Sequence, residues 1–248
     1  EVKLFKLLKQ MIFVNKCIIC EEGLPHDETV LLCNDCLAEW EEYLNTRCNR
    51  CDAKRKDCKC LPVDIRNTFE HGACWSVFYN GNNDIDSPDS LVYVLKRARD
   101  RDVINFCGNM MKKSLVSFCI AHKINYRDYA ITYTPRSKRN ARKYDFDQSR
   151  ELAKYLSKEL GIEFVEVFVN KGRKEQKKLD RYERIENAKE NYHIKKDFIN
   201  KHKKYFLVDD ILTSGATLCR CGELLYFLGA DDVIPVTYAK DNIFKGDK

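Results

Sequence analysis

The sequence predicts an α/β fold, with a parallel, doubly wound sheet behind a small cysteine-rich module. From residue 130 onward, short apolar runs with strand character alternate with segments of helical spacing. Strands that alternate with helices usually pair in parallel and carry helices on both faces. Before residue 61, cysteines occur in close pairs, a spacing typical of metal ligation. We therefore expect two domains, residues 1–61 and residues 62–248.

Composition limits the classes of function. The chain has 248 residues, of which 44% are hydrophobic, and a net charge of +6. The positive charge favours an anionic partner, and both phosphorylated sugars and nucleic acid fit that description. No apolar run approaches the roughly 20 residues that span a bilayer. The paired cysteines, in a chain without a recognisable secretory signal, indicate a reducing compartment, so we expect a cytoplasmic protein.

The elements that support the fold class follow from apolar spacing and from turn residues. A turn-rich surface loop is expected at residues 79–90, because it holds several asparagine and aspartate residues, one glycine and one proline. Gly161 and Gly229 should each end a helix. The expected helices are residues 2–14, 91–101, 147–160 and 217–228. The expected strands are residues 129–133, 162–169, 205–208 and 233–238.

Residues 208–217 carry the clearest chemical signal. Here a buried strand is followed by two acids and then by a turn of threonine, serine and glycine that opens a helix. Such acids lie at the carboxyl end of the strand, where open α/β sheets bind ligands. Backbone N–H groups at a helix N-terminus can hold a phosphate, and glycine lets the backbone come close. The candidate binding residues are Asp209, Asp210, Thr213, Ser214, Gly215, Ala216 and Thr217.

This string closely resembles the signature of type I phosphoribosyltransferases. The resemblance implies that the ligand is phosphoribosyl pyrophosphate and that Asp209 and Asp210 accept hydrogen bonds from ribose hydroxyls, directly or through magnesium. The string lacks the Gly-Lys-[Ser/Thr] ending of a P-loop and the Gly-x-Gly-x-x-Gly of a dinucleotide fold, which disfavours nucleotide hydrolysis and hydride transfer. A plain strand-to-helix turn without a ligand is the structural alternative.

Two basic segments accompany the loop. Residues 134–148 follow a predicted strand and include Arg136, Arg139 and Arg142, which are candidates to contact nucleic acid or pyrophosphate. Residues 174–184 form the second segment. In related transferases this region is a mobile loop that closes over pyrophosphate, so the resemblance makes Arg181 and Lys178 candidate catalytic residues that stabilise developing negative charge. A solvated charged helix is the alternative for the second segment.

The cysteine-rich module predicts two structural zinc sites. The eight candidate ligands are Cys17, Cys20, Cys33, Cys36, Cys48, Cys51, Cys58 and Cys60. An all-thiolate shell leaves no open position for water, so zinc catalysis is not expected. Spacing alone leaves open whether the pairs combine in order or interleave. Basic and aromatic residues near the knuckles suit nucleic acid, but acidic residues offset them, so a protein-docking platform fits equally well. The other five cysteines should be core residues.

The order of cysteine module, basic segments and loop resembles the ComF family over nearly the whole chain. Residues that match the family's motifs are Pro135, Arg139, Phe146, Gln148, Gln176, Leu179, Arg181, Arg184 and Asn187. The resemblance implies a double zinc ribbon and a role in natural transformation, in which the protein handles single-stranded DNA beside a helicase and DNA-processing proteins. Two alternatives stay open: an active phosphoribosyltransferase with an unknown base acceptor, and a non-enzymatic assembly protein that docks the helicase.

Overall fold

The computed structural model describes residues 15–25, 30–81, 87–97, 101–137, 146–172 and 181–242. Its centre is a four-stranded sheet in the order β1-β6-β5-β2. The strands are β1 (Cys74–Tyr79), β2 (Ala130–Tyr133), β5 (Lys204–Leu212) and β6 (Asp232–Asp241). All neighbouring pairs are parallel. The parallel sheet predicted from the sequence is confirmed.

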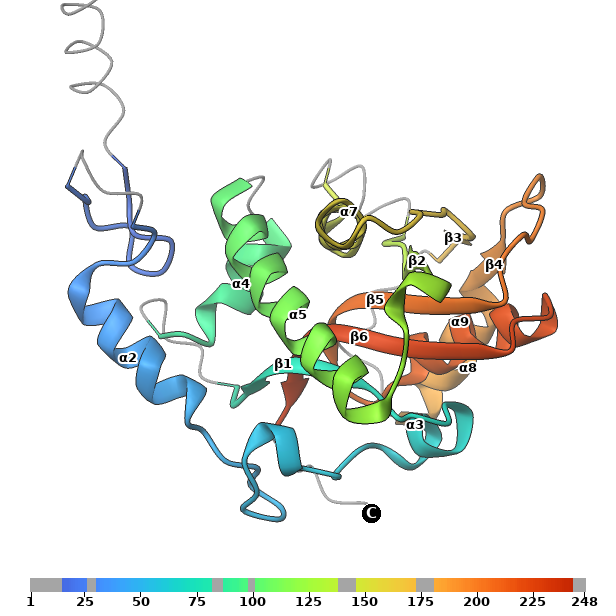
Figure 1. Cartoon of the computed structure of the whole chain (residues 1–248), viewed down its shortest axis with the longest axis horizontal. Helices are drawn as coiled ribbons and strands as arrows, with labels where there is room; N and C mark the ends of the chain where they lie inside the picture. Colours follow the sequence, from blue (N-terminus) through green and yellow to red (C-terminus); the bar gives the residue numbers. More distant parts are fainter. Residues whose placement is uncertain are drawn as a thin grey trace, which may run out of the picture.

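Helices cover both faces of this sheet, as Figure 1 shows. One face packs against α4 (Ser90–Arg97), α5 (Arg101–His122) and α7 (Gln148–Leu160). The other face packs against α3 (Val63–Thr68), α8 (Arg181–Asn191) and α9 (Ala216–Phe227). The doubly wound arrangement is therefore confirmed.

The two central strands, β5 and β6, are covered on both faces. Residues 205–208 of β5 and residues 233–240 of β6 are all buried, because helices lie on both faces. A strand that is covered on both sides reads as an unbroken apolar run rather than as an alternation. Tyr205 and Leu207 face the α9 side, and Phe206 and Val208 face the α5 side.

Several expected elements have other bounds. The strand expected at residues 162–169 is largely wrong: only β3 (Phe168–Asn170) forms, and it pairs antiparallel with β4 (Tyr192–Ile194) in a separate sheet. Phe164 makes a single bridge to Ile131 of β2 before the chain turns away. The expected helix at residues 91–101 corresponds to α4, and the helix α5 that follows it was not predicted. The expected helix at residues 2–14 lies outside the described residues.

The cysteine-rich segment runs along one side of the domain, drawn in blue in Figure 1. Its one α-helix among the described residues is α2 (Asn34–Leu44), which begins after Cys33. Trp40 of α2 packs edge-on against Phe106 of α5, with 5.1 Å between the ring centroids. Within the part of the chain that the structure covers, no helix has the length and apolar character that crossing a membrane requires. The five other cysteines are buried, as predicted: Cys74, Cys107, Cys119, Cys219 and Cys221.

Candidate functional site

The turn after β5 has the geometry that a close backbone approach requires. Gly215 adopts φ of 80°, in the left-handed region, and is the N-terminal cap of α9. A Cβ atom at this position would lie 2.6 Å from Cγ1 of Ile65, so a larger residue would collide with α3. The Ser214 hydroxyl accepts a hydrogen bond from the N–H of Ala216 at 3.5 Å. The turn therefore leads directly from the acids into a helix N-terminus, where N–H groups can bind an anion.

The two acids of β5 are held from α7. The Ser149 hydroxyl donates a hydrogen bond to Oδ1 of Asp209 at 3.0 Å, and the N–H of Asp210 donates to the same oxygen at 2.9 Å. Gln148 donates through Nε2 to Oδ2 of Asp210 at 2.8 Å. Asp210 is 6% exposed. Both carboxyl groups are thus oriented by the first turn of one helix.

The surroundings of Asp209 change its acidity. Burial, followed by the neighbouring charge of Asp210, raises the pKa of Asp209 to about 7. Hydrogen bonds from Thr134 and Ser149 act in the opposite direction without cancelling that rise. Two adjoining carboxyl groups that repel each other favour a proton or a cation between them. A hard divalent cation, which prefers carboxylate oxygen, fits this pair.

Arg136 lies at the same edge, just beyond β2. Its backbone N–H donates to Oδ2 of Asp147 at 2.9 Å, and its guanidinium donates through Nη1 to the carbonyl of Phe146 at 3.3 Å. Asp147 is also the N-terminal cap of α7 through the N–H of Arg150. The structure therefore brings Arg136 to the edge that carries the acids. The candidates Arg139, Arg142 and Lys178 lie outside the described residues, and Arg181 is the first residue of α8.

Sequence reasoning missed the residues that support this edge. Ser149 and Thr134 bind Asp209, and no local motif marks them. The amide of Asn170 donates to the Pro135 carbonyl at 3.2 Å and accepts from the N–H of Gly172 at 2.8 Å. The hydroxyl of Tyr192, whose pKa is raised by burial, bonds to Thr217 and Asn170. Ser149 lies at the start of a helix that faces the strand ends, and this position was the signal that could have identified it.

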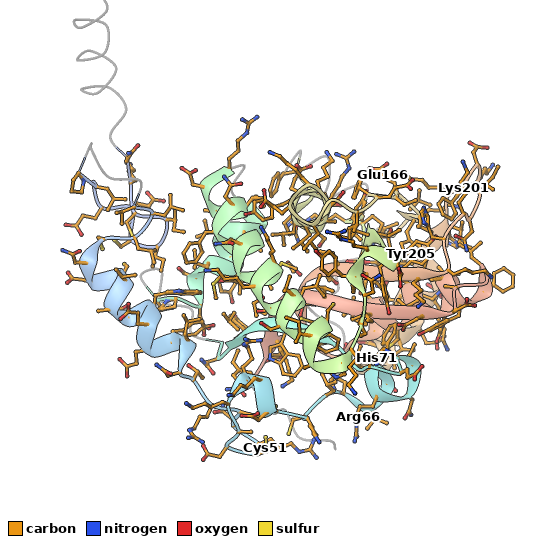
Figure 2. The ribbon with its side chains drawn as sticks, in the orientation of Figure 1. Cys51, Arg66, His71, Glu166, Lys201 and Tyr205 are labelled. Carbon is orange, nitrogen blue, oxygen red and sulfur yellow. The ribbon has the colours of Figure 1, made fainter. Side chains whose placement is uncertain are left out.

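A second charged network, centred on Glu166, lies beside this edge of the sheet. The Glu166 carboxylate accepts from Nε of Arg150 at 2.6 Å and from Nζ of Lys195 at 2.5 Å. Against the effect of burial, these two cations hold the pKa of Glu166 below its usual range. Figure 2 labels Glu166 close to the upper margin of the molecule. The network ties α7 to the small β3-β4 sheet, which carries Asn170.

The cysteines form two separate clusters. Cys17, Cys20, Cys33 and Cys36 make one, and Cys48, Cys51, Cys58 and Cys60 make the other, with all Sγ atoms of each set within 4.8 Å of one another. The pairs therefore combine in order, which spacing had left open. The Cys20–Cys33 and Cys51–Cys58 sulfur atoms lie 3.6 and 3.9 Å apart. Tetrahedral zinc with Zn–S bonds of about 2.3 Å needs roughly 3.8 Å, so both sets fit this metal.

The second cluster is attached to the ends of β1 and β6. Asn49 donates from its backbone N–H to Oδ1 of Asn242 at 2.9 Å, and the Asn242 amide donates to the Arg47 carbonyl at 3.0 Å and to Oδ1 of Asn80 at 2.8 Å. Arg55 donates through Nη1 to the Trp75 carbonyl of β1 at 2.8 Å. This cluster therefore borders the sheet itself.

Comparison with known proteins adds an independent finding. Competence protein ComFC of Streptococcus pneumoniae is 22% identical over 229 residues, which cover 88% of this chain and 96% of that protein. The resemblance to the ComF family is confirmed. No family model matches this ComF-like chain. Among solved structures, a hypoxanthine phosphoribosyltransferase from Staphylococcus aureus shows 14% identity and a TM-score of 0.34, covering 55% of this chain and 73% of its own.

Proposed function

We propose that this ComF-like chain binds phosphoribosyl pyrophosphate, together with magnesium, at the carboxyl edge of its sheet. The observation that carries the proposal is the adjoining pair Asp209 and Asp210, followed at once by the Gly215 turn and the N-terminus of α9. Carboxylates suit ribose hydroxyls and a hard cation, and helix N–H groups suit a phosphate. Because the acids and the helix N-terminus belong to one continuous segment, the ribose and the phosphate of a single ligand would contact them together.

Each part of the edge has a stated role in this proposal. The N–H groups and hydroxyls of residues 213–217 hold the 5′-phosphate, and the two aspartates bind the ribose. Gln148 and Ser149 keep the aspartates in place. Arg136 binds the pyrophosphate, and Lys178 and Arg181 stabilise the negative charge that develops on it. Magnesium, when bound, neutralises oxygen charges of the pyrophosphate.

Calorimetry with phosphoribosyl pyrophosphate tests this site. The double variant Asp209→Asn, Asp210→Asn should lose at least tenfold in affinity and should lose the dependence on magnesium. Both side chains keep their shape, so folding is expected to be retained. Asp231→Asn is the matched control, because Asp231 is an exposed aspartate at the opposite end of the sheet. Equal binding by all three proteins, or no binding by wild type, would contradict the proposal.

The same proposal has two further parts. Single-stranded DNA binds the basic segment of residues 134–148, and the protein acts in DNA uptake in the cytoplasm, beside a helicase and DNA-processing proteins. Its support is the similarity to a competence protein and the position of Arg136 at the ligand edge. Neutralising Arg136, Arg139 and Arg142 should reduce the salt dependence of binding as well as the affinity. Fluorescence anisotropy with a labelled oligonucleotide at several salt concentrations measures both. Unchanged salt dependence in the triple variant would refute this assignment.

Transfer of the phosphoribosyl group to a base is the second candidate function. It is favoured because Arg136 lies on the edge that carries the acids, where a departing pyrophosphate needs positive charge. Pyrophosphate release during incubation with magnesium and a panel of bases tests it. Binding without any release would leave the chain as a binding protein.

We also propose that each of the two cysteine clusters holds a structural zinc ion. Four thiolates in each set leave no open coordination position, so neither ion takes part in chemistry. Metal analysis of the purified full chain should give two zinc ions per molecule. A single zinc ion per molecule would show that only one of the two clusters binds zinc.

A further inference from the structure

Lys240 is an unusual residue for the interior of a sheet. It lies near the end of β6 and is 3% exposed, and it is the buried lysine among the residues that the structure describes. Its register partners are Phe78 on β1 and Leu212 on β5. A buried ammonium group is unfavourable unless nearby groups compensate its charge. The surroundings of Lys240 therefore indicate what its charge is for.

Two aromatic rings surround the ammonium group. Nζ of Lys240 lies 5.5 Å from the centroid of the Trp75 ring and 5.2 Å from that of Phe78. Ring faces attract cations, most strongly where water is excluded. These same two rings pack against Cys48 and Cys58 in one buried cluster. The ammonium group thus shares a small apolar compartment with two ligands of the second cysteine centre.

The charge of a loaded centre explains this arrangement. Zinc with four thiolates carries a formal charge of about −2, and burying that charge needs a nearby cation. Two of its ligands, Cys48 and Cys58, are only 2% and 7% exposed, so solvent screens their charge little. Among the other cations of the module, Lys54, Lys56 and Lys59 are exposed, so solvent screens them, and the half-buried Arg55 is bonded through Nη1 to the Trp75 carbonyl.

We propose that Lys240 is the buried counter-charge of the second cysteine centre and a positioning residue that favours its four thiolates around zinc. This inference rests on the proposed zinc ions. The first centre offers a contrast, because the buried charged residues of the described chain are Asp89, Asp210 and Lys240, none of them a cation beside Cys17 or Cys36. Removal of the Lys240 charge should therefore weaken one centre and spare the other.

The test uses the full chain loaded with zinc. Lys240→Met keeps the length and the apolar stem but removes the charge, and Lys240→Arg keeps the charge. Lys204→Met is the matched control, since Lys204 lies 5.7 Å from the Tyr129 ring at the opposite end of the sheet, away from both centres. Competition with a chelating dye measures the affinity for each ion. Alkylation followed by mass spectrometry shows which cysteines lose protection.

Lys240→Met should bind one of the two zinc ions about 10- to 100-fold more weakly, the usual effect of losing a partner outside the ligand shell. Alkylation should then reach Cys48, Cys51, Cys58 and Cys60 but not the first set. Lys240→Arg and Lys204→Met should resemble wild type. In the metal-free form, Lys240→Met should unfold no more easily than wild type, because it buries no charge.

Three results would overturn the inference. These are unchanged affinity in Lys240→Met, equal weakening of both ions, and equal weakening by Lys240→Arg and Lys240→Met. A wild-type chain that takes no zinc at the second set would instead refute the proposed zinc centre, and with it the basis of this inference. The two failures are therefore distinguishable in one experiment.

Discussion

The two cysteine centres are alike in local structure and different in what they touch. Glu21 and Asp52, each the residue after the second cysteine of a Cys-x-x-Cys pair, both adopt positive φ, of 60° and 54°. Each donates its N–H to the carbonyl of the first cysteine of that pair, at 3.0 and 2.9 Å. The same knuckle therefore occurs twice. The repetition follows from the spacing of the thiols around one metal position.

Their neighbours are not alike. The first centre leads into α2, whose Trp40 packs on α5, while the second centre is bonded through Asn49 to Asn242 at the end of β6. One centre thus supports a helical layer, and the other supports the edge of the sheet that also carries the candidate ligand site. Identical local motifs can serve different parts of a fold, because docking depends on residues distant in sequence.

The largest effect should come from removing the buried cysteines of each centre. Two double variants make this test: Cys48→Ser with Cys58→Ser, and Cys17→Ser with Cys36→Ser. Each should lower the free energy of unfolding by on the order of 5 kcal/mol, through loss of the metal. Hydrogen exchange should then separate them. The first variant should lose amide protection in β1 and β6, and the second in α2. Identical exchange patterns in the two variants would show that the two centres do not stabilise different parts of the fold.

The pH dependence of stability should be independent of both centres. Asp209 has a pKa of about 7 in the folded chain against an ordinary value of 3.8, so between these values the folded state keeps a proton that the unfolded state has lost. Stability therefore falls as pH rises from about 4 to 7, by up to about 4 kcal/mol.

Asp209→Asn should remove this fall and should be more stable than wild type at pH 8. Urea unfolding at several pH values, without magnesium, measures it. The Asp209→Asn change should have the same effect in the background of either cysteine variant, because Asp209 contacts neither centre. A slope that vanishes with the second centre alone would show that the edge and this centre are coupled.

Asn242 tests the docking of the second centre. Asn242→Ala removes hydrogen bonds to Asn49, Arg47 and Asn80 in a buried position, and we expect a loss of about 3 kcal/mol with faster zinc release from the second centre only. Asn200→Ala is the control, since Asn200 also makes several bonds but lies away from both centres. Zinc release that is equally fast in both variants would show a general loss of stability.

The smallest effect concerns the two knuckle residues. Glycine relieves a left-handed conformation, so Glu21→Gly should stabilise the chain by about 0.5 to 1 kcal/mol. Asp52→Gly should gain less, because Asp52 tolerates this conformation better than glutamate and accepts a hydrogen bond from Arg47 at 3.3 Å. Thermal unfolding of the zinc-loaded proteins measures the difference. A larger gain at position 52 would mean that the two knuckles are not equivalent.

Much of this protein was determined by local sequence. Short apolar runs that alternate with segments of helical spacing predicted a parallel sheet, and two of these runs form the buried parts of β5 and β6. The acids, glycine and hydroxyls of residues 208–217 predicted a strand, a turn and a helix in that order. The closely spaced cysteine pairs, three Cys-x-x-Cys and one Cys-x-Cys, predicted metal ligation. In each case neighbouring residues carry the whole signal.

Tertiary structure alone decided the rest. Spacing could not tell whether cysteine pairs combine in order, because that depends on how the chain folds back. Residues 162–169 look like one strand, yet most of them bend away after Phe164 to let Glu166 meet Arg150 and Lys195. Ser149 reaches Asp209, and Lys240 reaches the rings beside Cys48 and Cys58, across separations that no local pattern records. Contacts of this kind depend on how whole elements pack, and packing is set by the complete chain.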